Sequence, residues 1–158
     1  FALTYPERVS GLVILNSFPY FTPQIRLRLA IAGLMIVPWG AMQVVRRLTA
    51  FRLHSRLTHR EDMAQFMRLT ARATRRGYLN RLRLLQTYDV REGLRGLNVP
   101  TLFVAADEDH LVPSVEQAEL MARLTPGATV RVLAGHGHIC LIAPGVDLAG
   151  LIGEWRSS

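Results

Sequence analysis

The chain has 158 residues, 49% of them hydrophobic and 20% charged, so it can bury a core and is not a disordered polymer. Its single cysteine, Cys140, excludes an internal disulfide and a cysteine-based metal cluster, and this composition fits a reducing cytoplasm. The formal net charge of +7 comes from arginine alone, and no nucleic-acid-binding motif accompanies it, so no nucleic-acid partner is expected.

The charge divides the chain into two compositional regions. Residues 21–99 carry 15 arginines against 4 acidic residues, whereas residues 100–158 carry 3 arginines against 7 acidic residues. The first residues lack the basic start and apolar run of a secretory signal. We therefore expect a cytoplasmic protein with a basic middle and a mildly acidic end.

The N-terminal residues predict one strand. Residues 2–5 are expected to end a helix before Pro6. The apolar run of residues 9–15, closed by Asn16 and Ser17, predicts a parallel strand covered on both faces. Two prolines within residues 17–23 then predict a loop that leads out of the sheet.

Helical periodicity follows over residues 24–88. It predicts a first helix that ends or kinks before Pro38, and further helices over residues 41–52, 60–74 and 76–87. Arginines occupy the polar sides of these amphipathic helices. The uncharged residues 29–42 are too few for a membrane span, which needs about 20. These residues could instead form a buried helix face, a helix at a membrane interface or the wall of an apolar pocket.

The last third of the chain alternates strand and helix. Strands are predicted over residues 99–105 and 129–133, and a helix over residues 114–124. Ser114 has the position of a helix N-cap, and Gln117 has the spacing of a capping box. A closing helix follows. This order predicts a parallel α/β sheet with right-handed crossovers.

Functional groups gather in two loops that follow predicted strands. The first loop, ADEDHLVP, contains Asp107 and Asp109, and the second, AGHGHICL, contains His136 and His138. Parallel strands bring the loops at their carboxyl ends together. An imidazole there could find the carboxylate partner that fixes its tautomer.

These loops resemble the C-terminal half of α/β-hydrolase-fold proteins. VPTLFVAADEDHLVP is similar to the family segment that carries the triad acid, which the resemblance places at Asp109 with Asp107 as the nearest competitor. VRVLAGHGHICL is similar to the segment of the triad base, which it places at His138. FALTYPERVSGLVILNS resembles the segment that follows the nucleophile helix and enters the sixth strand.

The resemblance implies a partial α/β-hydrolase fold, with three parallel strands, flanking helices and an inserted helical cap. Residues 1–20 would hold the end of the nucleophile helix and the sixth strand, residues 21–95 the cap, and residues 96–158 the C-terminal α/β core. The chain contains no G-x-S-x-G nucleophile elbow, which the family pattern places about ten residues before Phe1. We therefore expect a partial enzyme that is inactive without an N-terminal half.

The implied function is that of the C-terminal part of a serine-type hydrolase of small, hydrophobic esters or related acyl compounds, without a cofactor. An aspartate nucleophile, as in epoxide hydrolases and haloalkane dehalogenases, remains open. Ser17, Trp39 and His136 are the candidates for lining the substrate pocket, and the histidines show no metal-ligand spacing. The alternative is a noncatalytic fragment or pseudo-enzyme whose arginine-rich helices bind acidic partners or a membrane surface.

Overall fold

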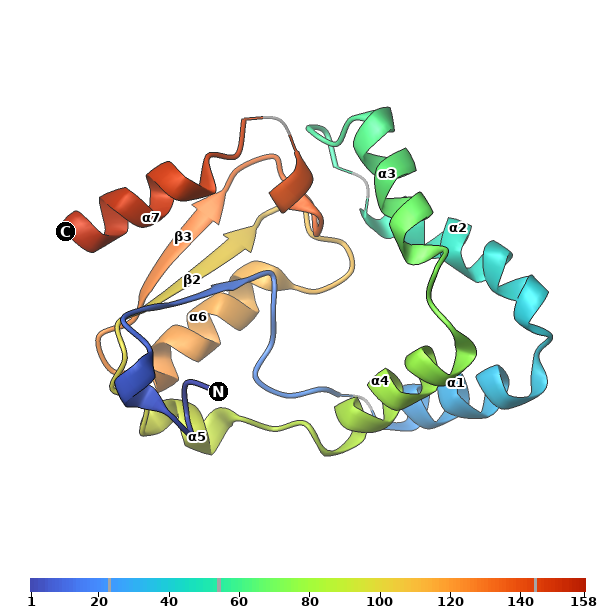
Figure 1. The fold of residues 1–158 in the computed structure, drawn as a ribbon, viewed down its shortest axis with the longest axis horizontal. Helices are drawn as coiled ribbons and strands as arrows, with labels where there is room; N and C mark the ends of the chain where they lie inside the picture. The colour runs from blue at the N-terminus through green and yellow to red at the C-terminus, as the bar shows by residue number, and fades with distance from the viewer. Residues whose placement is uncertain (23, 54, 144) are drawn as a thin grey trace.

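The computed structural model describes residues 1–22, 24–53, 55–143 and 145–158. Its sheet has three parallel strands in the order β1-β2-β3 (Figure 1), which are β1 (Leu12–Leu15), β2 (Thr101–Ala106) and β3 (Thr129–Leu133). The register places Leu12 opposite Thr101 and Leu102 opposite Thr129. The predicted α/β class with three parallel strands is confirmed.

The central strand forms the middle of the core. All six residues of β2 are buried, which explains why its sequence is a continuous apolar run instead of an alternating one. Helices α5 (Arg91–Arg95) and α6 (Ser114–Leu124) pack beside it. The buried cluster consists of Leu94, Leu97, Val99, Phe103, Ala105, Ala118 and Met121.

Of the helices between β1 and β2 in the chain, α1 to α4 extend away from the sheet, whereas α5 packs on the core (Figure 1). We call this part, residues 24–87, the helical insertion. Helix α1 lies beside α4, and α2 contacts α3. Within the described ranges, no helix combines the length and apolarity needed to cross a membrane. The bounds are α1 (Gln24–Ile36), α2 (Met42–Leu53), α3 (Arg60–Thr70) and α4 (Arg75–Thr87), with a short 3-10 helix, η2 (Trp39–Ala41), before α2.

The C-terminal segment contains η3 (Cys140–Ile142) and α7 (Leu148–Ser157). Trp155 of α7 lies against Gly11, where an added Cβ would come within 3.2 Å of the indole ring. Helix α7 therefore packs against the residue that precedes β1.

Two local predictions need correction at the ends of elements. Residues 1–5 form a single turn, and Pro6 begins a 3-10 helix, η1 (Pro6–Arg8), instead of ending one. Proline suits a first helical position because its missing amide would have no partner there. Helix α3 ends at Thr70, because Thr74 is the N-cap of α4 and accepts a hydrogen bond from Gly77 N at 3.1 Å.

Candidate active site

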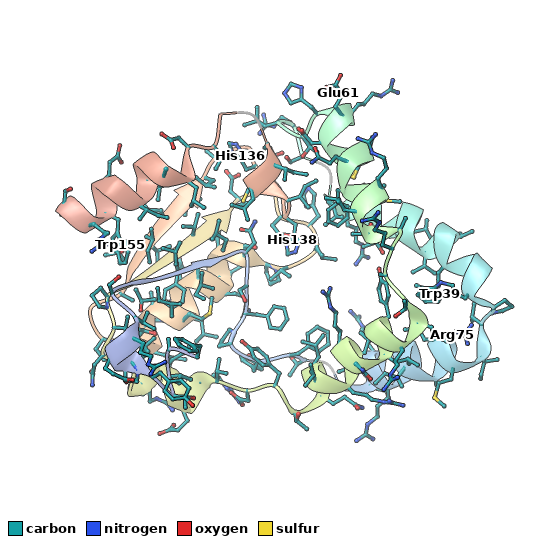
Figure 2. The ribbon with its side chains drawn as sticks, viewed as in Figure 1. Trp39, Glu61, Arg75, His136, His138 and Trp155 are labelled. Atoms are coloured by element: carbon teal, nitrogen blue, oxygen red, sulfur yellow. The ribbon has the colours of Figure 1, made fainter. Side chains whose placement is uncertain are left out.

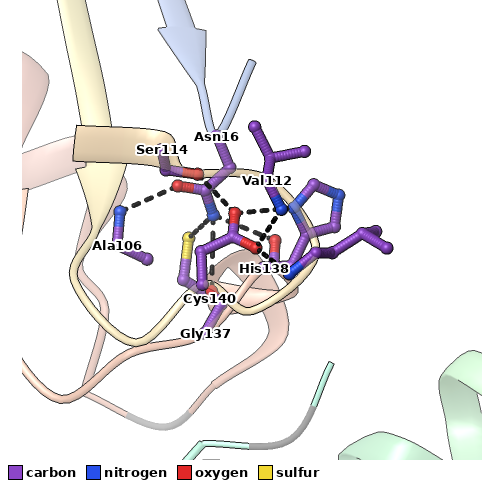
Figure 3. Close-up of polar contacts among 9 residues, drawn as sticks. Asn16, Ala106, Val112, Ser114, Gly137, His138 and Cys140 are labelled. Carbon is purple, nitrogen blue, oxygen red and sulfur yellow. Dashed lines mark hydrogen bonds and ion pairs between the residues drawn. The ribbon is translucent and has the colours of Figure 1, made fainter. Parts of the chain in front are cut away.

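An imidazole and a carboxylate meet where the loops after β2 and β3 converge. His138 Nδ1 lies 2.8 Å from Asp109 Oδ2 (Figure 3). The Asp109 side chain is 0% exposed, whereas the His138 side chain is 27% exposed. Because a carboxylate can only accept, the proton of neutral His138 lies on Nδ1 and Nε2 is left as the basic nitrogen. The pair therefore presents a base held by a buried acid.

The Asp109 carboxylate is held on both oxygens. Oδ1 accepts from Leu111 N at 2.9 Å and from Val112 N at 3.0 Å, and the Ser114 hydroxyl donates to Oδ2. Burial would by itself raise the pKa of Asp109, but hydrogen bonds from His138, Ser114 and Val112 outweigh it and hold this pKa below its ordinary value. Asp109 is therefore ionised at neutral pH.

The predicted capping box at Ser114 is wrong. The N-cap of α6 is Pro113, and the Ser114 hydroxyl bonds Asp109 instead of a backbone amide of the helix. Ser114 is already the first residue of α6, and its hydroxyl proton goes to the buried carboxylate, which is a strong acceptor. Ser114 therefore begins α6 and also holds the carboxylate of Asp109.

Neighbouring acidic-loop residues hold the backbone of the histidine loop. Asp107 Oδ1 accepts from Gly135 N at 2.7 Å, and Glu108 N donates to the carbonyl oxygen of His136 at 3.0 Å. Asp107 thus contacts the loop backbone, while Asp109 contacts an imidazole. The two aspartates lie two positions apart in the sequence but have different hydrogen-bond partners in the structure.

The histidine loop contains two glycines, and the fold requires each of them for a different reason. Gly135 has a φ of +74°, a conformation that residues with a Cβ rarely adopt. Gly137 passes close to the end of α2, where an added Cβ would lie 3.0 Å from the carbonyl oxygen of Leu53 and 3.1 Å from Ser55 Cβ. The first glycine is required by the turn, and the second by the close approach of the helical insertion.

Gly137→Ala is expected to destabilise the protein by about 1–3 kcal/mol, because its methyl group would be forced against backbone. Gly153→Ala is the matched control: it lies in α7 with nothing within 4 Å of an added Cβ. This control should stabilise the protein by about 0.5–1 kcal/mol through the helix propensity of alanine. Denaturant unfolding of both variants measures the difference, and equal effects would contradict the close approach.

Asn16, directly after β1, connects the end of β2 to the histidine loop that follows β3. Its Oδ1 accepts from Ala106 N at 2.9 Å, and its Nδ2 donates to the His138 carbonyl at 3.0 Å and lies 3.3 Å from the Gly137 carbonyl oxygen (Figure 3). Nδ2 also lies 3.2 Å from Cys140 Sγ. Asn16 is 8% exposed and has a φ of +44°, which asparagine tolerates better than most residues. The local sequence around Asn16 indicates only the end of a strand, and these contacts appear only in the folded protein.

Asn16→Asp is expected to cost about 1–3 kcal/mol of stability, because a carboxylate cannot donate to the loop carbonyls. The aspartate would still accept the hydrogen bond from Ala106 N. The loss of stability therefore measures the hydrogen bonds that the Asn16 NH₂ group donates. Asn80→Asp, on an exposed position of α4, is the matched control and should stay within about 0.5 kcal/mol of the wild type. Equal stability of the Asn16 and Asn80 variants in urea would contradict this role.

The remaining candidates lie in different places. His136 Nδ1 lies 2.9 Å from the Ala134 carbonyl oxygen, and its buried Nε2 has no partner among the described residues. Figure 2 shows His138 turned towards the centre of the molecule and His136 nearer α7. Trp39 packs edge-on against Tyr78, with ring centroids 5.9 Å apart, and lies far from His138 (Figure 2). Ser17 is half-buried and follows Asn16 directly.

A cavity of about 290 Å³ lies beside His138. Neither Ser17 nor Trp39 belongs to its described lining, but Phe66 of α3 does, so the helical insertion forms part of its wall. Among the described residues, no group of three or more His, Cys, Asp or Glu is placed to hold a metal ion. The other lining residues are Leu15, Asn16 and 139–142.

Comparison with protein families and curated proteins identifies relatives. The sequence profile of the alpha/beta hydrolase fold family matches residues 1–143. The chain is 37% identical over 89 residues to homoserine O-acetyltransferase of Salinibacter ruber, covering 51% of this chain and 25% of that protein. It is 27% identical over 158 residues to the putative carbamate hydrolase RutD of Pantoea ananatis, covering 98% of this chain and 57% of that protein.

Solved structures share the fold. A hydrolase from Pseudomonas aeruginosa PA01 superposes with a TM-score of 0.84 at 19% identity, and a thermophilic esterase from Thermogutta terrifontis with a TM-score of 0.80 at 22% identity. Each match covers 99% of this chain and 59% of the other. At these identities the likeness shows the fold alone, and the chain spans little more than half of these relatives.

Proposed function

Since the chain belongs to the alpha/beta hydrolase fold family, whose profile matches residues 1–143, we propose that it is the C-terminal part of a serine-type hydrolase of esters or related acyl compounds. Asp109 and His138 are the acid and base of its triad. One observation carries the proposal: the 2.8 Å contact between His138 Nδ1 and a fully buried Asp109 carboxylate at the carboxyl ends of two parallel strands.

In this mechanism a serine outside the 158 residues attacks the acyl carbon, and His138 Nε2 takes the hydroxyl proton. The tetrahedral intermediate collapses, and His138 gives this proton to the leaving group. Water then attacks the acyl-enzyme, and the same nitrogen accepts and returns a proton. Throughout the cycle, ionised Asp109 orients the ring and stabilises its charged form.

The nucleophile is proposed to lie outside these residues for two reasons. No G-x-S-x-G occurs within them, and Ser17 follows β1 without such an elbow. Nearly all of this chain matches RutD of Pantoea ananatis and the two solved structures. The match covers 57–59% of the length of those proteins.

Labelling with a fluorophosphonate probe tests the proposal in the full-length protein. We expect one labelled serine, within a G-x-S-x-G sequence outside the residues described here, and loss of labelling in the His138→Ala variant. Peptide mapping by mass spectrometry locates the label. A labelled Ser17 would contradict the proposal, and so would an active protein that is labelled nowhere, as an aspartate nucleophile would give.

A further inference from the structure

A second cavity, of about 430 Å³, is lined by Leu111, Val112 and Pro113 of the loop that carries Asp109. Val112 lines it, and the amide of this residue donates to Asp109 Oδ1, so the cavity borders the proposed catalytic acid. Phe18 and Phe21 contribute aromatic walls, and their ring centroids lie 5.6 Å apart. The walls can therefore hold the carbon skeleton of a small molecule next to the proposed catalytic pair.

Two arginines of the helical insertion also line this cavity. Arg26 lies in the first turn of α1, and Arg52 in the last turn of α2. Within the described part of the chain, neither arginine has an ion pair or a hydrogen bond. A cation in the first turn of a helix opposes the helix dipole, so Arg26 is not placed there to stabilise α1.

Asp89 and Asp109, two acidic residues near this cavity, already have partners. The described lining of this cavity contains no acidic side chain. Asp89, which pairs with Tyr20 of the cavity wall through a β-bridge, is held by Arg91 Nε and Nη2, and its pKa is lowered to about 2. Asp109 is held by His138 and Ser114. Both guanidinium groups are thus left for an anion from solution.

We propose that this cavity binds an anionic end of the substrate, so that the substrate class is an ester or related acyl compound that also carries a carboxylate or phosphate. The inference rests on the proposed hydrolase function and refines the purely hydrophobic substrate that the sequence predicts. The aromatic walls hold the carbon chain, and Arg26 and Arg52 hold the charge. Planar guanidinium groups bind carboxylate and phosphate oxygens with two parallel hydrogen bonds.

Two matched esters test the charge preference in the full-length protein. The mono-4-nitrophenyl ester of adipic acid and 4-nitrophenyl hexanoate have acyl chains of the same length and differ in the terminal carboxylate. We expect a higher kcat/KM for the adipate ester. Arg26→Gln and Arg52→Gln should each lower the adipate-to-hexanoate ratio by about tenfold or more, the effect of losing a charged hydrogen bond.

Arg28→Gln and Arg83→Gln are the controls, because both arginines are exposed and neither lines this cavity. They lower the net charge equally and should leave the ratio within about twofold, since exposed charges are screened beyond a Debye length. A wild-type ratio of one or less overturns the proposal. An equal fall in all four variants also overturns it, because it would show a general field effect.

Binding measurements separate this inference from the hydrolase proposal. Calorimetric titration of the full-length protein with adipate and with phenyl phosphate needs no catalysis, and it shows which anion the cavity prefers. Suppose that the protein binds an anion, that Arg26→Gln and Arg52→Gln abolish this binding, and that no ester is hydrolysed. This result would support the anion-binding cavity and contradict the proposed hydrolase function. Hydrolysis of the hexanoate ester without anion binding would support the hydrolase function and contradict the anion-binding cavity.

Discussion

In the full-length protein, His138→Ala is expected to lower kcat for 4-nitrophenyl hexanoate by about 10⁴-fold or more. The variant removes the only group in the proposed triad that can take the serine proton, and alanine leaves no substitute. The His138 side chain is 27% exposed and is tied to the protein mainly through Asp109, so the fold should survive its truncation. Steady-state rates and thermal unfolding, measured together, separate lost chemistry from lost structure.

His136→Ala is the matched control, since it removes an imidazole from the same loop. His136 is directed to the Ala134 carbonyl instead of a carboxylate, and the variant should keep most of the wild-type kcat. If the losses are reversed, with His136→Ala inactive and His138→Ala active, the proposed base is wrong. An unfolded His138→Ala protein would show that the imidazole is structural.

Asp109→Asn is expected to lower kcat by about 10⁴-fold, because an amide can turn its NH₂ group towards His138 and favour the wrong tautomer. Asp107→Asn is the matched control. It keeps an oxygen acceptor for Gly135 N, so most of the activity should remain. Rates of the two variants with one substrate provide the measurement, and equal losses would contradict the assignment of Asp109 over Asp107.

The pH dependence of stability gives a second measurement on Asp109. Its folded-state pKa is lowered, so the ionised carboxylate stabilises the folded protein above the unfolded-state pKa of about 3.9. This contribution is lost as the pH falls through the lower folded-state value. Urea unfolding free energies should therefore decline less steeply below about pH 4 for Asp109→Asn than for the wild type. Parallel declines would mean that Asp109 is not held as an ion.

Local patterns predicted the sheet because its strands and helices have strong signals of their own. The apolar run before Asp107 predicted β2, and burial on both faces is the reason that no polar residue interrupts it. The strand Thr129–Leu133 and the helix Ser114–Leu124 are confirmed at the predicted residues. The family resemblance drawn from the two loops is confirmed by the profile match. The roles of Asp109 and His138 remain predictions.

Tertiary structure decided which polar groups meet. By itself, the sequence determined the α/β class, the strand order along the chain and the two loops that carry acids and imidazoles. It favoured Asp109 over Asp107 only through the family resemblance, because both aspartates follow the same strand and only the folded loops show which one contacts His138. Nor could it pair Asn16 with His138, or Arg26 with Arg52 across one cavity. Such contacts join residues far apart in the chain, and no local periodicity records them.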